Sequence, residues 1–219
     1  MTLSAAQLVD DGHARLEAGR YSETRRRTLA AALDLFADHG VTGTSLQMIA
    51  DAVGVTKAAI YHQFKTKEAI VIGVTEVVLA RLEDALEEAE AQPSREAGRL
   101  LLLTSVIDLA IERRRWVNAL QGDPAMIRTL GEHAPFVDLM NRVYSLLLDE
   151  AADDASLMRT AIVSAAIGAA LVHPLVAHLD DETMRVELLR VTRRLFDLDV
   201  RPDARRARSG RTGRAAPTA

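Results

Sequence analysis

Cysteine is absent from the 219-residue chain, so neither a disulfide framework nor a thiolate-ligated zinc site can form. The absence of disulfides suits a reducing compartment. Aromatic residues make up only 4% of the sequence, and alternating runs of β-branched and aromatic residues are scarce. Because strands favour such runs, whereas the abundant Ala, Leu, Arg and Glu favour helices, we expect an all-α fold.

A long hydrophobic run is also missing. The longest apolar stretch, residues 161–172, contains Ser164 and Gly168 and is shorter than the about 20 residues that span a bilayer. The N-terminal segment MTLSAAQLVDDGHARLEAGR contains acidic residues and no apolar block, unlike a secretory signal peptide. We therefore expect a cytoplasmic protein with no membrane partner.

Charge is unevenly distributed along the chain, although the net charge is −4. Residues 20–67 carry seven Lys and Arg against four Asp and Glu, and residues 201–219 carry six Arg against one Asp. Residues 68–200 carry thirteen basic and twenty-three acidic residues. Because a local basic surface matters more for phosphate binding than the total, the acidic balance does not exclude nucleic acid as a partner.

Helix boundaries are marked by capping hydroxyls and by glycine or proline stops. The first half is predicted to form helices at about 22–39, 45–52, 57–63 and from 67 onward. The expected N-caps are Thr44 (with Gln47 completing a capping box), Thr56 and Thr66, and the expected stops are Gly40, Gly54 and Pro93.

The second half is predicted to contain longer helices. Apolar residues recur at helical spacing over about 94–120, 124–131, 134–151, 156–179 (interrupted by Pro174) and 181–198. Residues 1–20 show weak periodicity and are interpreted as an arm. The Arg-, Gly- and Pro-rich segment 201–219 is predicted to be a disordered tail.

Two short helices joined by Gly54-Val55 predict a helix-turn-helix. The first helix would cross the DNA backbone, and the second, 57–63, would enter a major groove about 12 Å wide. Ala58 allows close approach of the backbone, and Lys57 can reach a phosphate or a base. Tyr61 and His62 can donate hydrogen bonds to either.

Further candidate contacts lie at neighbouring helix starts. Lys65 and Lys67 precede or open the next helix, where exposed N–H groups attract phosphate, and Thr44 offers a hydroxyl and amides at another helix start. Structural explanations compete with these assignments. Gly-centred turns occur in many helical bundles, Tyr61 can be a half-buried core residue, and His62 and the lysines can be ordinary surface residues.

The segment from Thr24 to Val74 resembles the N-terminal domain of the tetracycline-repressor (TetR) family of transcriptional regulators. The matching motifs are Leu35-Phe36-x-x-x-Gly40, Thr44-Ser45, Ile49-Ala50, Gly54-Val55, Ile60-Tyr61-His62-x-Phe64 and Lys67-Glu68. This resemblance implies that residues 57–63 form the recognition helix and that the DNA contacts are Thr44, Thr56, Lys57, Tyr61, His62 and Lys67.

The resemblance also suggests how these contacts divide. Tyr61 and Lys67 would hold phosphates, whereas Lys57 and Ala58 would face bases, Ala58 against a thymine methyl. Arg25–Arg27 would lie near the DNA backbone or be solvated. The implied organisation is an arm at 1–20, a DNA-binding domain at 21–66, a ligand-binding and dimerisation domain at 67–200, and the tail at 201–219.

In the resembled family the last two long helices form a dimer interface, here residues 156–179 and 181–198; the alternative is that both helices line the core of a monomer. A homodimer would read a palindromic operator with half-sites about 34–36 Å apart. Repression is the commoner behaviour in the family. A ligand that spreads the recognition helices, with the tilt of the helix from 67 transmitting the change, would release the DNA.

The effector cavity is expected among the helices of the second domain, and an apolar ligand such as an acyl chain, a sterol-like molecule or a drug would fit it. An anionic end would meet Arg113–Arg115, unless these arginines are surface residues. Each candidate is also a plausible core residue, and an empty or absent pocket stays open. The candidate lining residues are Trp116, Leu120, Met126, Phe136, Met140, Tyr144 and His173.

An all-α metalloenzyme is the alternative from another class. Such a site needs a Glu-x-x-His pair on inward helix faces, but Glu132 and His133 are adjacent. His173 and His178 are five residues apart with Pro174 between them, and no nucleophile–base set converges. We therefore predict no enzyme activity, no metal and no cofactor. A third alternative, an interaction module without DNA binding, is separable by the salt dependence of DNA affinity.

Overall fold

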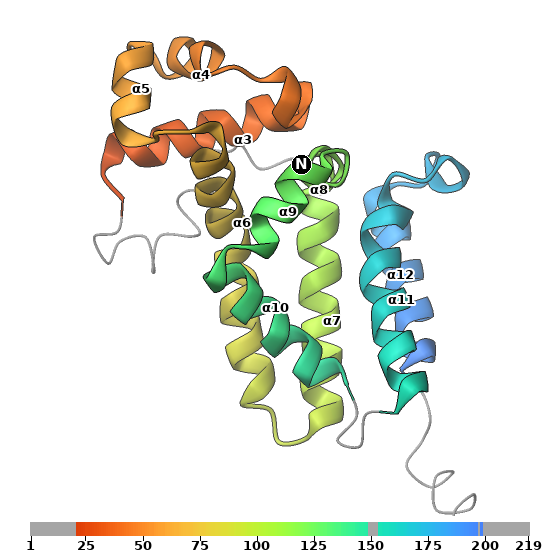
Figure 1. The fold of residues 1–219 in the computed structure, drawn as a ribbon. Helices are drawn as coiled ribbons and strands as arrows, with labels where there is room; N and C mark the ends of the chain where they lie inside the picture. Colours follow the sequence, from red (N-terminus) through yellow and green to blue (C-terminus); the bar gives the residue numbers. More distant parts are fainter. Residues whose placement is uncertain (1–20, 149–152, 197, 199–219) are drawn as a thin grey trace, which may run out of the picture.

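The computed structural model describes residues 21–148, 153–196 and 198, and this part of the chain is helical with no strand (Figure 1). The predicted all-α class is confirmed. The expected arm at 1–20 and tail at 201–219 lie outside the described residues. Three N-terminal helices sit at one end of a bundle of longer helices, and one long helix runs from the first group into the second (Figure 1).

The N-terminal group consists of α3 (Glu23–Gly43), α4 (Leu46–Val53) and α5 (Lys57–Gln63). The α4 cap differs by one residue from the prediction. The hydroxyl of Ser45, and not that of Thr44, accepts the backbone N–H of Met48 at 3.2 Å. The side chain of Gln47 donates to Asp51 at 2.8 Å and so does not complete a capping box.

Two glycines end helices in this group through positive φ angles. Gly40 has φ 71° and breaks the helical path of α3, after which one further turn leads to Gly43. Gly54 has φ 77° and ψ 37°, and its N–H donates to the carbonyl of Ala50 at 3.0 Å. The predicted stops at Gly40 and Gly54 are therefore confirmed. Glycine occupies them because residues with a side chain rarely adopt a positive φ angle.

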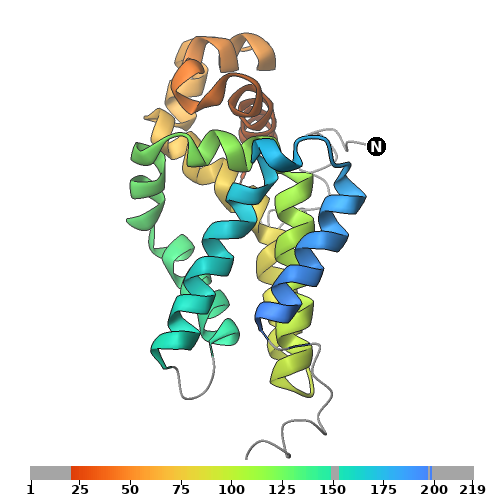
Figure 2. The ribbon, with the colours of Figure 1, turned by 90° about the vertical axis from the view of Figure 1, so that its right-hand side faces the viewer.

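The bundle consists of seven further α-helices and one short 3-10 helix in the described part of the chain. These are α6 (Lys67–Glu90), α7 (Arg95–Glu112), α8 (Arg114–Gln121), α9 (Pro124–Gly131), α10 (Ala134–Leu147), α11 (Asp154–Leu171), η1 (Pro174–Val176) and α12 (Asp181–Leu195). Helix α6 leads from the N-terminal group along α7, and α11 and α12 pair along one side of the bundle (Figures 1 and 2).

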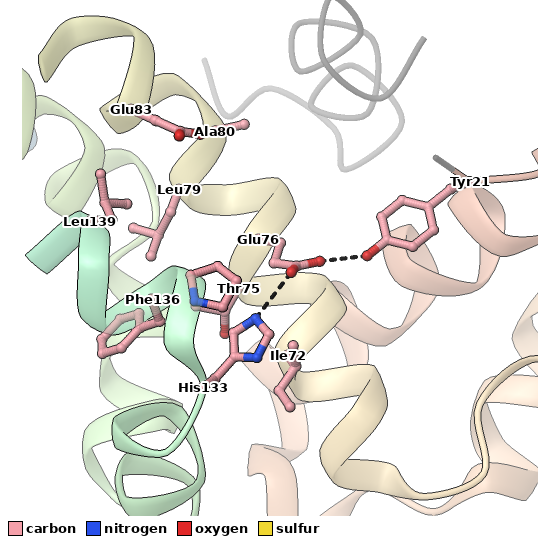
Figure 3. A pocket seen from close by; sticks show the side chains of 11 residues that line it. Tyr21, Ile72, Thr75, Glu76, Leu79, Ala80, Glu83, His133, Phe136 and Leu139 are labelled. Carbon is pink, nitrogen blue, oxygen red and sulfur yellow. Dashed lines mark hydrogen bonds and ion pairs between the residues drawn. The ribbon is translucent and has the colours of Figure 1, made fainter. Parts of the chain in front are cut away.

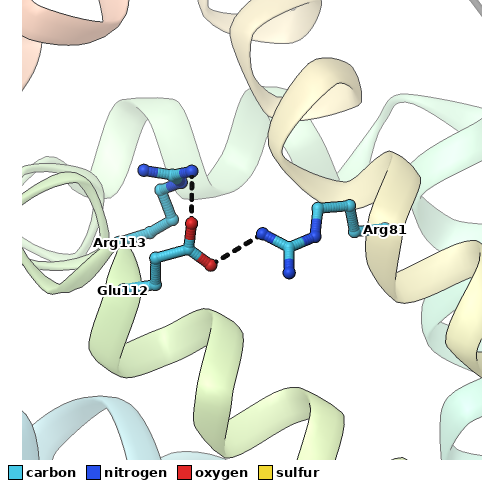
Figure 4. Close-up of polar contacts among 3 residues, drawn as sticks. All are labelled: Arg81, Glu112 and Arg113. Atoms are coloured by element: carbon cyan, nitrogen blue, oxygen red, sulfur yellow. Dashed lines mark hydrogen bonds and ion pairs between the residues drawn. The ribbon is translucent and has the colours of Figure 1, made fainter. Parts of the chain in front are cut away.

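The single helix expected over 94–120 is wrong, because the chain breaks at Arg113, which has φ −110° and ψ 20°. Arg113 is buried at this corner and donates to the neighbouring Glu112 at 2.7 Å. The same carboxylate accepts from Arg81 of α6 at 2.8 Å (Figure 4). Burial lowers the pKa of Arg113, and the bond to Glu112 opposes that shift. The corner between α7 and α8 is thus fixed against α6.

Two buried clusters hold the fold together. The second fills the space between α6, α7, α10, α11 and α12. The first lies under the N-terminal helices, and it includes Trp116 from α8 and Met126 from α9. The bundle therefore contributes side chains to the same core on which α4 and α5 pack. The largest fully buried residues of the first cluster are Leu29, Phe36, Ile49, Ile60, Phe64 and Ile70.

Candidate nucleic-acid interface

Helix α5 has one buried and one exposed face. Ile60 is 0% exposed and Phe64, at the end of the helix, is 1% exposed, so these two side chains anchor α5 in the core. Tyr61 is 54% exposed, and His62 is exposed beside it. The Tyr61–His62 edge therefore faces outward, and Tyr61 is not part of the buried core.

The start of α5 adds more polar groups to the same outward face. Thr56 caps the helix by accepting the N–H of Ala59 at 3.1 Å, and its own hydroxyl hydrogen can still donate. Lys57 and Ala58 follow and are exposed. An α-helix is about 10–12 Å across with its side chains, so the seven-residue α5 fits a major groove about 12 Å wide.

Lys65 and Lys67 are placed differently, although they are two residues apart. Lys65 is exposed, with its ammonium 5.3 Å from the centre of the Tyr61 ring, so its charge lies beside the exposed face of α5. The ammonium of Lys67 donates to the carbonyls of Val41 at 2.8 Å and Thr44 at 3.1 Å. It satisfies carbonyls in the last turn and at the C-cap of α3, and a phosphate would have to compete with them.

Thr44 is turned inward, in contrast to the expectation that its hydroxyl meets DNA. The residue is 1% exposed, and its hydroxyl donates to the carbonyl of Gly40 at 2.8 Å. Its backbone N–H donates to Val41 at 3.3 Å. The expectation that the hydroxyl and amide of Thr44 contact DNA is therefore corrected, because both groups already donate hydrogen bonds to carbonyls at the end of α3.

The three arginines at the start of α3 contact the chain itself. The guanidinium of Arg25 lies between two rings, 4.5 Å from the centre of Tyr21 and 4.7 Å from that of Phe64. Arg26 pairs with Glu23. Arg27 donates to the carbonyl of Val53 at the end of α4, at 2.9 Å. Arg25 and Arg27 thus hold α3 against α5 and α4, respectively.

The predicted effector-contacting residues are not brought together. Trp116 and Met126 are buried in the first cluster with Leu120 packed against it, and Met140 packs on the second. His173 is exposed and accepts the N–H of Leu175 at 3.2 Å as the cap of η1. Phe136 and Tyr144 line two separate hollows.

The hollow that Phe136 lines was not predicted as a whole. It is lined by residues of α6, of the segment that joins α9 to α10 and of α10, and Glu76 is one of them (Figure 3). One signal in the sequence points to it. Glu76 and Glu83 recur with Ile72 and Leu79 at helical spacing, which places carboxylates among apolar residues on one face of α6.

Arg113, Arg114 and Arg115, which we considered for an anionic ligand, each have a carboxylate partner. Arg113 is buried against Glu112, Arg114 pairs with Asp181 at 3.1 Å, and Arg115 pairs with Asp38 of α3. In the described ranges, no group of three or more His, Asp or Glu residues could hold a metal ion.

Helix α11 is long and apolar enough to cross a membrane by length and composition, and one third of it is buried. The sequence expectation had counted only residues 161–172. One helix of this kind is weak support for a membrane span, because the core helix of a soluble protein can have the same length and composition. Its outward side is apolar, with Leu157, Met158 and Ile162 about half exposed or more.

Comparison with known proteins gives a match for the helix-turn-helix segment. Residues 29–74 match the family described as "Bacterial regulatory proteins, tetR family". Over 45 residues the chain is 56% identical to the HTH-type transcriptional regulator AcrR of Shigella flexneri, which covers 20% of this chain and 21% of AcrR. A 74-residue match to SrpR of Pseudomonas putida is 39% identical and covers 34% and 33% of the two chains. These matches span about a fifth to a third of those relatives.

Solved structures extend the likeness to the whole fold. Bacillus subtilis FadR, solved in complex with stearoyl-CoA, superposes with a TM-score of 0.61 at 16% identity, covering 76% of this chain and 96% of FadR. NalD of Pseudomonas aeruginosa, described as the secondary repressor of a multidrug efflux pump, gives 0.58 at 23% identity, covering 78% and 94%. At these identities the likeness shows a shared fold.

Proposed function

We propose that this chain, which belongs to the TetR family through its N-terminal domain, is a cytoplasmic, sequence-specific DNA-binding transcriptional regulator. The observation that carries the proposal is the outward face of α5, where Lys57, Ala58, Tyr61 and His62 are exposed while Ile60 is buried. Compact and hydrogen-bonding side chains on a short helix suit the reading of bases and phosphates in a major groove. Thr56 and Lys65 complete this DNA-facing surface, and Lys67 would join it only by leaving its carbonyl partners.

Two copies are needed for tight binding, because one seven-residue helix contacts only a few base pairs. We assign the dimer interface to α11 and α12, near the expected segments 156–179 and 181–198. Large apolar side chains remain exposed on this pair, more than single surface residues would explain. They are Leu157, Met158, Ile162, Val186, Val191 and Leu195. A palindromic operator with half-sites about 34–36 Å apart follows from the two-fold symmetry.

Regulation by a small effector is the second part of the proposal. Relatives of this fold include FadR, solved with stearoyl-CoA, and NalD, described as a repressor. Helix α6 begins beside the DNA-facing surface and lines the hollow that contains Glu76. A ligand that prefers a conformer with spread recognition helices would release DNA, which makes repression the expected mode.

The test is selection of duplexes from a random-sequence pool by the purified full-length protein, followed by affinity measurement on the selected fragment. We expect a palindrome, and we expect affinity to fall by roughly 10²–10⁵ between low and moderately high salt as counterions return to phosphates. A scrambled duplex of equal length and composition is the control.

Failure has a defined form. A folded dimer that prefers no selected duplex over the scrambled one at low salt contradicts sequence-specific recognition. A salt-independent affinity contradicts a phosphate contact by Lys65.

A further inference from the structure

Helix α8 is attached to α3 at both of its ends. Near its start, Arg115 pairs with Asp38 of α3, and Trp116 is buried in the cluster beneath α3. Just after its end, Oδ2 of Asp123 accepts the hydroxyl of Thr42, in the last turn of α3, at 2.9 Å. Two attachments on one helix fix a direction as well as a position. Helix α3 should therefore turn with α8 as one unit.

Helix α8 also contacts α11, and a glycine makes that contact close (Figure 2). Gly168 of α11 is buried, and the amide end of Gln121, the last residue of α8, lies against it. A Cβ added at residue 168 would overlap Nε2 of Gln121 and lie 3.1 Å from its Cδ. Any larger residue at position 168 would therefore have to push the end of α8 away from α11.

The contact between α8 and α11 is open toward the start of α8. A hollow of about 200 Å³ separates the two helices there. Its lining residues include Arg114, Arg115, Asn118, Leu171 and Val172. Because protein interiors are close-packed, a region with free volume yields more readily than one in full contact. Helix α8 is thus held against α11 at its last residue and has room to turn at its start.

Gly168 lies on the inner side of α11. Val163 and Ile167 are buried on this side, whereas Leu157 and Ile162 are exposed on the outward side that we assign to the dimer interface. A substitution at Gly168 therefore acts first on α8, without placing a new side chain in the proposed dimer interface.

We propose that the contact of Gln121 with Gly168 is a pivot that sets the angle of the DNA-binding domain relative to α11 and α12. Helix α3 turns with α8, and Ile60 anchors α5 in the cluster beneath α3, so the angle reaches the recognition helix. In a two-fold dimer, equal turns of both domains change the distance between the two α5 helices. Gln121 and Gly168 are then positioning residues for the spacing of the half-sites. The spacing rests on the proposed function, whereas the angle does not.

The angle is tested by a distance measurement without DNA. Because the chain contains no cysteine, Ala52→Cys on α4 and Glu182→Cys on α12 introduce two exposed sites for spin labels. Double electron–electron resonance in an excess of unlabelled protein reports the distance within one chain. Gly168→Leu should shift the mean distance by at least about 2 Å, because its side chain forces the end of α8 away from α11. Gly168→Ala should give a smaller shift of the same sign.

Two further variants isolate the contact. Gly168→Leu combined with Gln121→Ala transfers side-chain bulk from α8 to α11 and should restore the original distance, since volume-conserving changes are tolerated best. Gly131→Leu on α9 is the matched control and should leave the distance unchanged. Apart from its chain neighbours and the backbone of its own helix, no atom of the described residues lies within 4 Å of a Cβ added at Gly131.

Two results overturn the pivot. One is an unshifted distance in the Gly168→Leu protein, shown to be folded by circular dichroism. If that protein does not fold, an unshifted distance in the Gly168→Ala protein has the same meaning. The other is a shift that persists after Gln121→Ala is added, because contact with Gln121 would then not be its cause.

The spacing is tested on the selected operator by inserting or deleting base pairs between its half-sites. Each base pair changes their separation by about 3.4 Å and rotates one half-site by about 35°. Gly168→Leu should lose at least about tenfold in affinity for the original spacing, while its affinity for a duplex with a single half-site stays within about twofold. Equal losses on both duplexes would mean damage to the DNA-binding domain and would overturn the positioning role.

The two measurements separate this inference from the proposed function. If no operator is found while the distance shifts with Gly168→Leu and returns with Gln121→Ala, DNA recognition fails and the pivot stands. If an operator is found and the distance is insensitive to both substitutions of Gly168, the pivot fails and DNA recognition stands.

Discussion

The indole ring of Trp116 on α8 stacks against Phe36 of α3, with ring centroids 5.8 Å apart and an interplanar angle of 27°. Trp116 is 3% exposed and Phe36 is 0% exposed. Arg115, the neighbour of Trp116, pairs with Asp38 of the same helix α3. Helix α8 is therefore an integral support of the DNA-binding domain, and contact between the two domains is not confined to α6.

Trp116→Ala should lower the free energy of unfolding by about 3–5 kcal/mol, because it removes a buried aromatic side chain and leaves a cavity beside Phe36. The measurement is urea unfolding followed by far-UV circular dichroism. Asn118→Ala on the same helix, at an exposed position, is the control and should stay within about 0.5 kcal/mol. A loss below about 1 kcal/mol for Trp116→Ala would show that the stack contributes little.

Lys65 and Lys67 offer a matched pair with opposite expectations. Lys67→Met removes the donor to the carbonyls of Val41 and Thr44 and should lower the free energy of unfolding by about 1–3 kcal/mol. Lys65→Met should leave stability within about 0.5 kcal/mol and reduce the salt dependence of operator affinity by about one phosphate contact. Urea unfolding and fluorescence anisotropy at several salt concentrations measure the two effects. The reverse pattern would mean that Lys67 is the phosphate ligand.

Gly54→Ala should destabilise the protein by about 1–2 kcal/mol, because an alanine at φ 77° brings its Cβ too close to the backbone. Apart from its own residue and its two chain neighbours, no atom lies within 4 Å of the added Cβ, so the cost would come from the local backbone alone. Gly131→Ala adds a Cβ to equally open space without a positive φ, and it should be neutral or slightly stabilising. Equal effects of the two substitutions on the urea midpoint would refute the conformational explanation.

Ile162→Glu should convert the proposed dimer to a monomer at micromolar concentration, because it introduces a charge at the centre of the apolar face of α11. Analytical ultracentrifugation measures the mass, and operator affinity should fall by at least about tenfold as one half-site is lost. Ile127→Glu on α9 changes a residue of similar exposure, 49% against 53%, and should leave the dimer intact. A dimeric Ile162→Glu protein would exclude this face as the interface.

The N-cap of α12 should make stability depend on pH. Hydrogen bonds from the backbone and side chain of Thr183 lower the pKa of Asp180 in the folded protein. A lowered folded-state pKa means that the contribution is complete above the ordinary aspartate value of about 3.9 and is lost as the pH falls through the folded-state pKa. The stability difference between the unmodified and Asp180→Ala proteins should thus be largest near neutrality and shrink below about pH 4.

Urea midpoints between neutral and acidic pH measure this difference. Asp138→Ala, which removes an exposed carboxylate of α10, controls for the change in net charge. A difference between the unmodified and Asp180→Ala proteins that stays constant down to the lowest pH would contradict a role for the ionised cap.

Most helix boundaries were predictable because their causes are local. The positive φ of Gly54 and the capping hydroxyls of Thr56 and Thr66 act within a few residues of themselves, and the sequence displays them directly. The break at Arg113 was missed because its causes are not local. It depends on burial at a corner and on a carboxylate that Arg113 shares with Arg81, thirty-two positions earlier.

In the candidate site, too, the features set by local spacing were predictable and those set by tertiary contacts were not. The outward direction of Tyr61 follows from helical spacing relative to Ile60 and Phe64. The inward direction of Thr44 and the carbonyl partners of Lys67 depend on how the chain folds back after α3, which spacing does not encode. The grouping of Tyr21, Glu76 and His133 joins positions more than fifty residues apart, so no local pattern could predict it.

The shared first cluster limits how this protein can be cut and recombined. A fragment ending at residue 66 would lack Ile70 and Val74 from α6 as well as Trp116 and Met126, all of which fill the interior under α3. Such a fragment would expose Phe36 to water and would not be a stable, independent DNA-binding domain. A functional chimera that joins this DNA-binding domain to a different ligand-binding domain must therefore include α8 and α9 of this protein. The alternative is to redesign the surface of the DNA-binding domain that α8 and α9 contact.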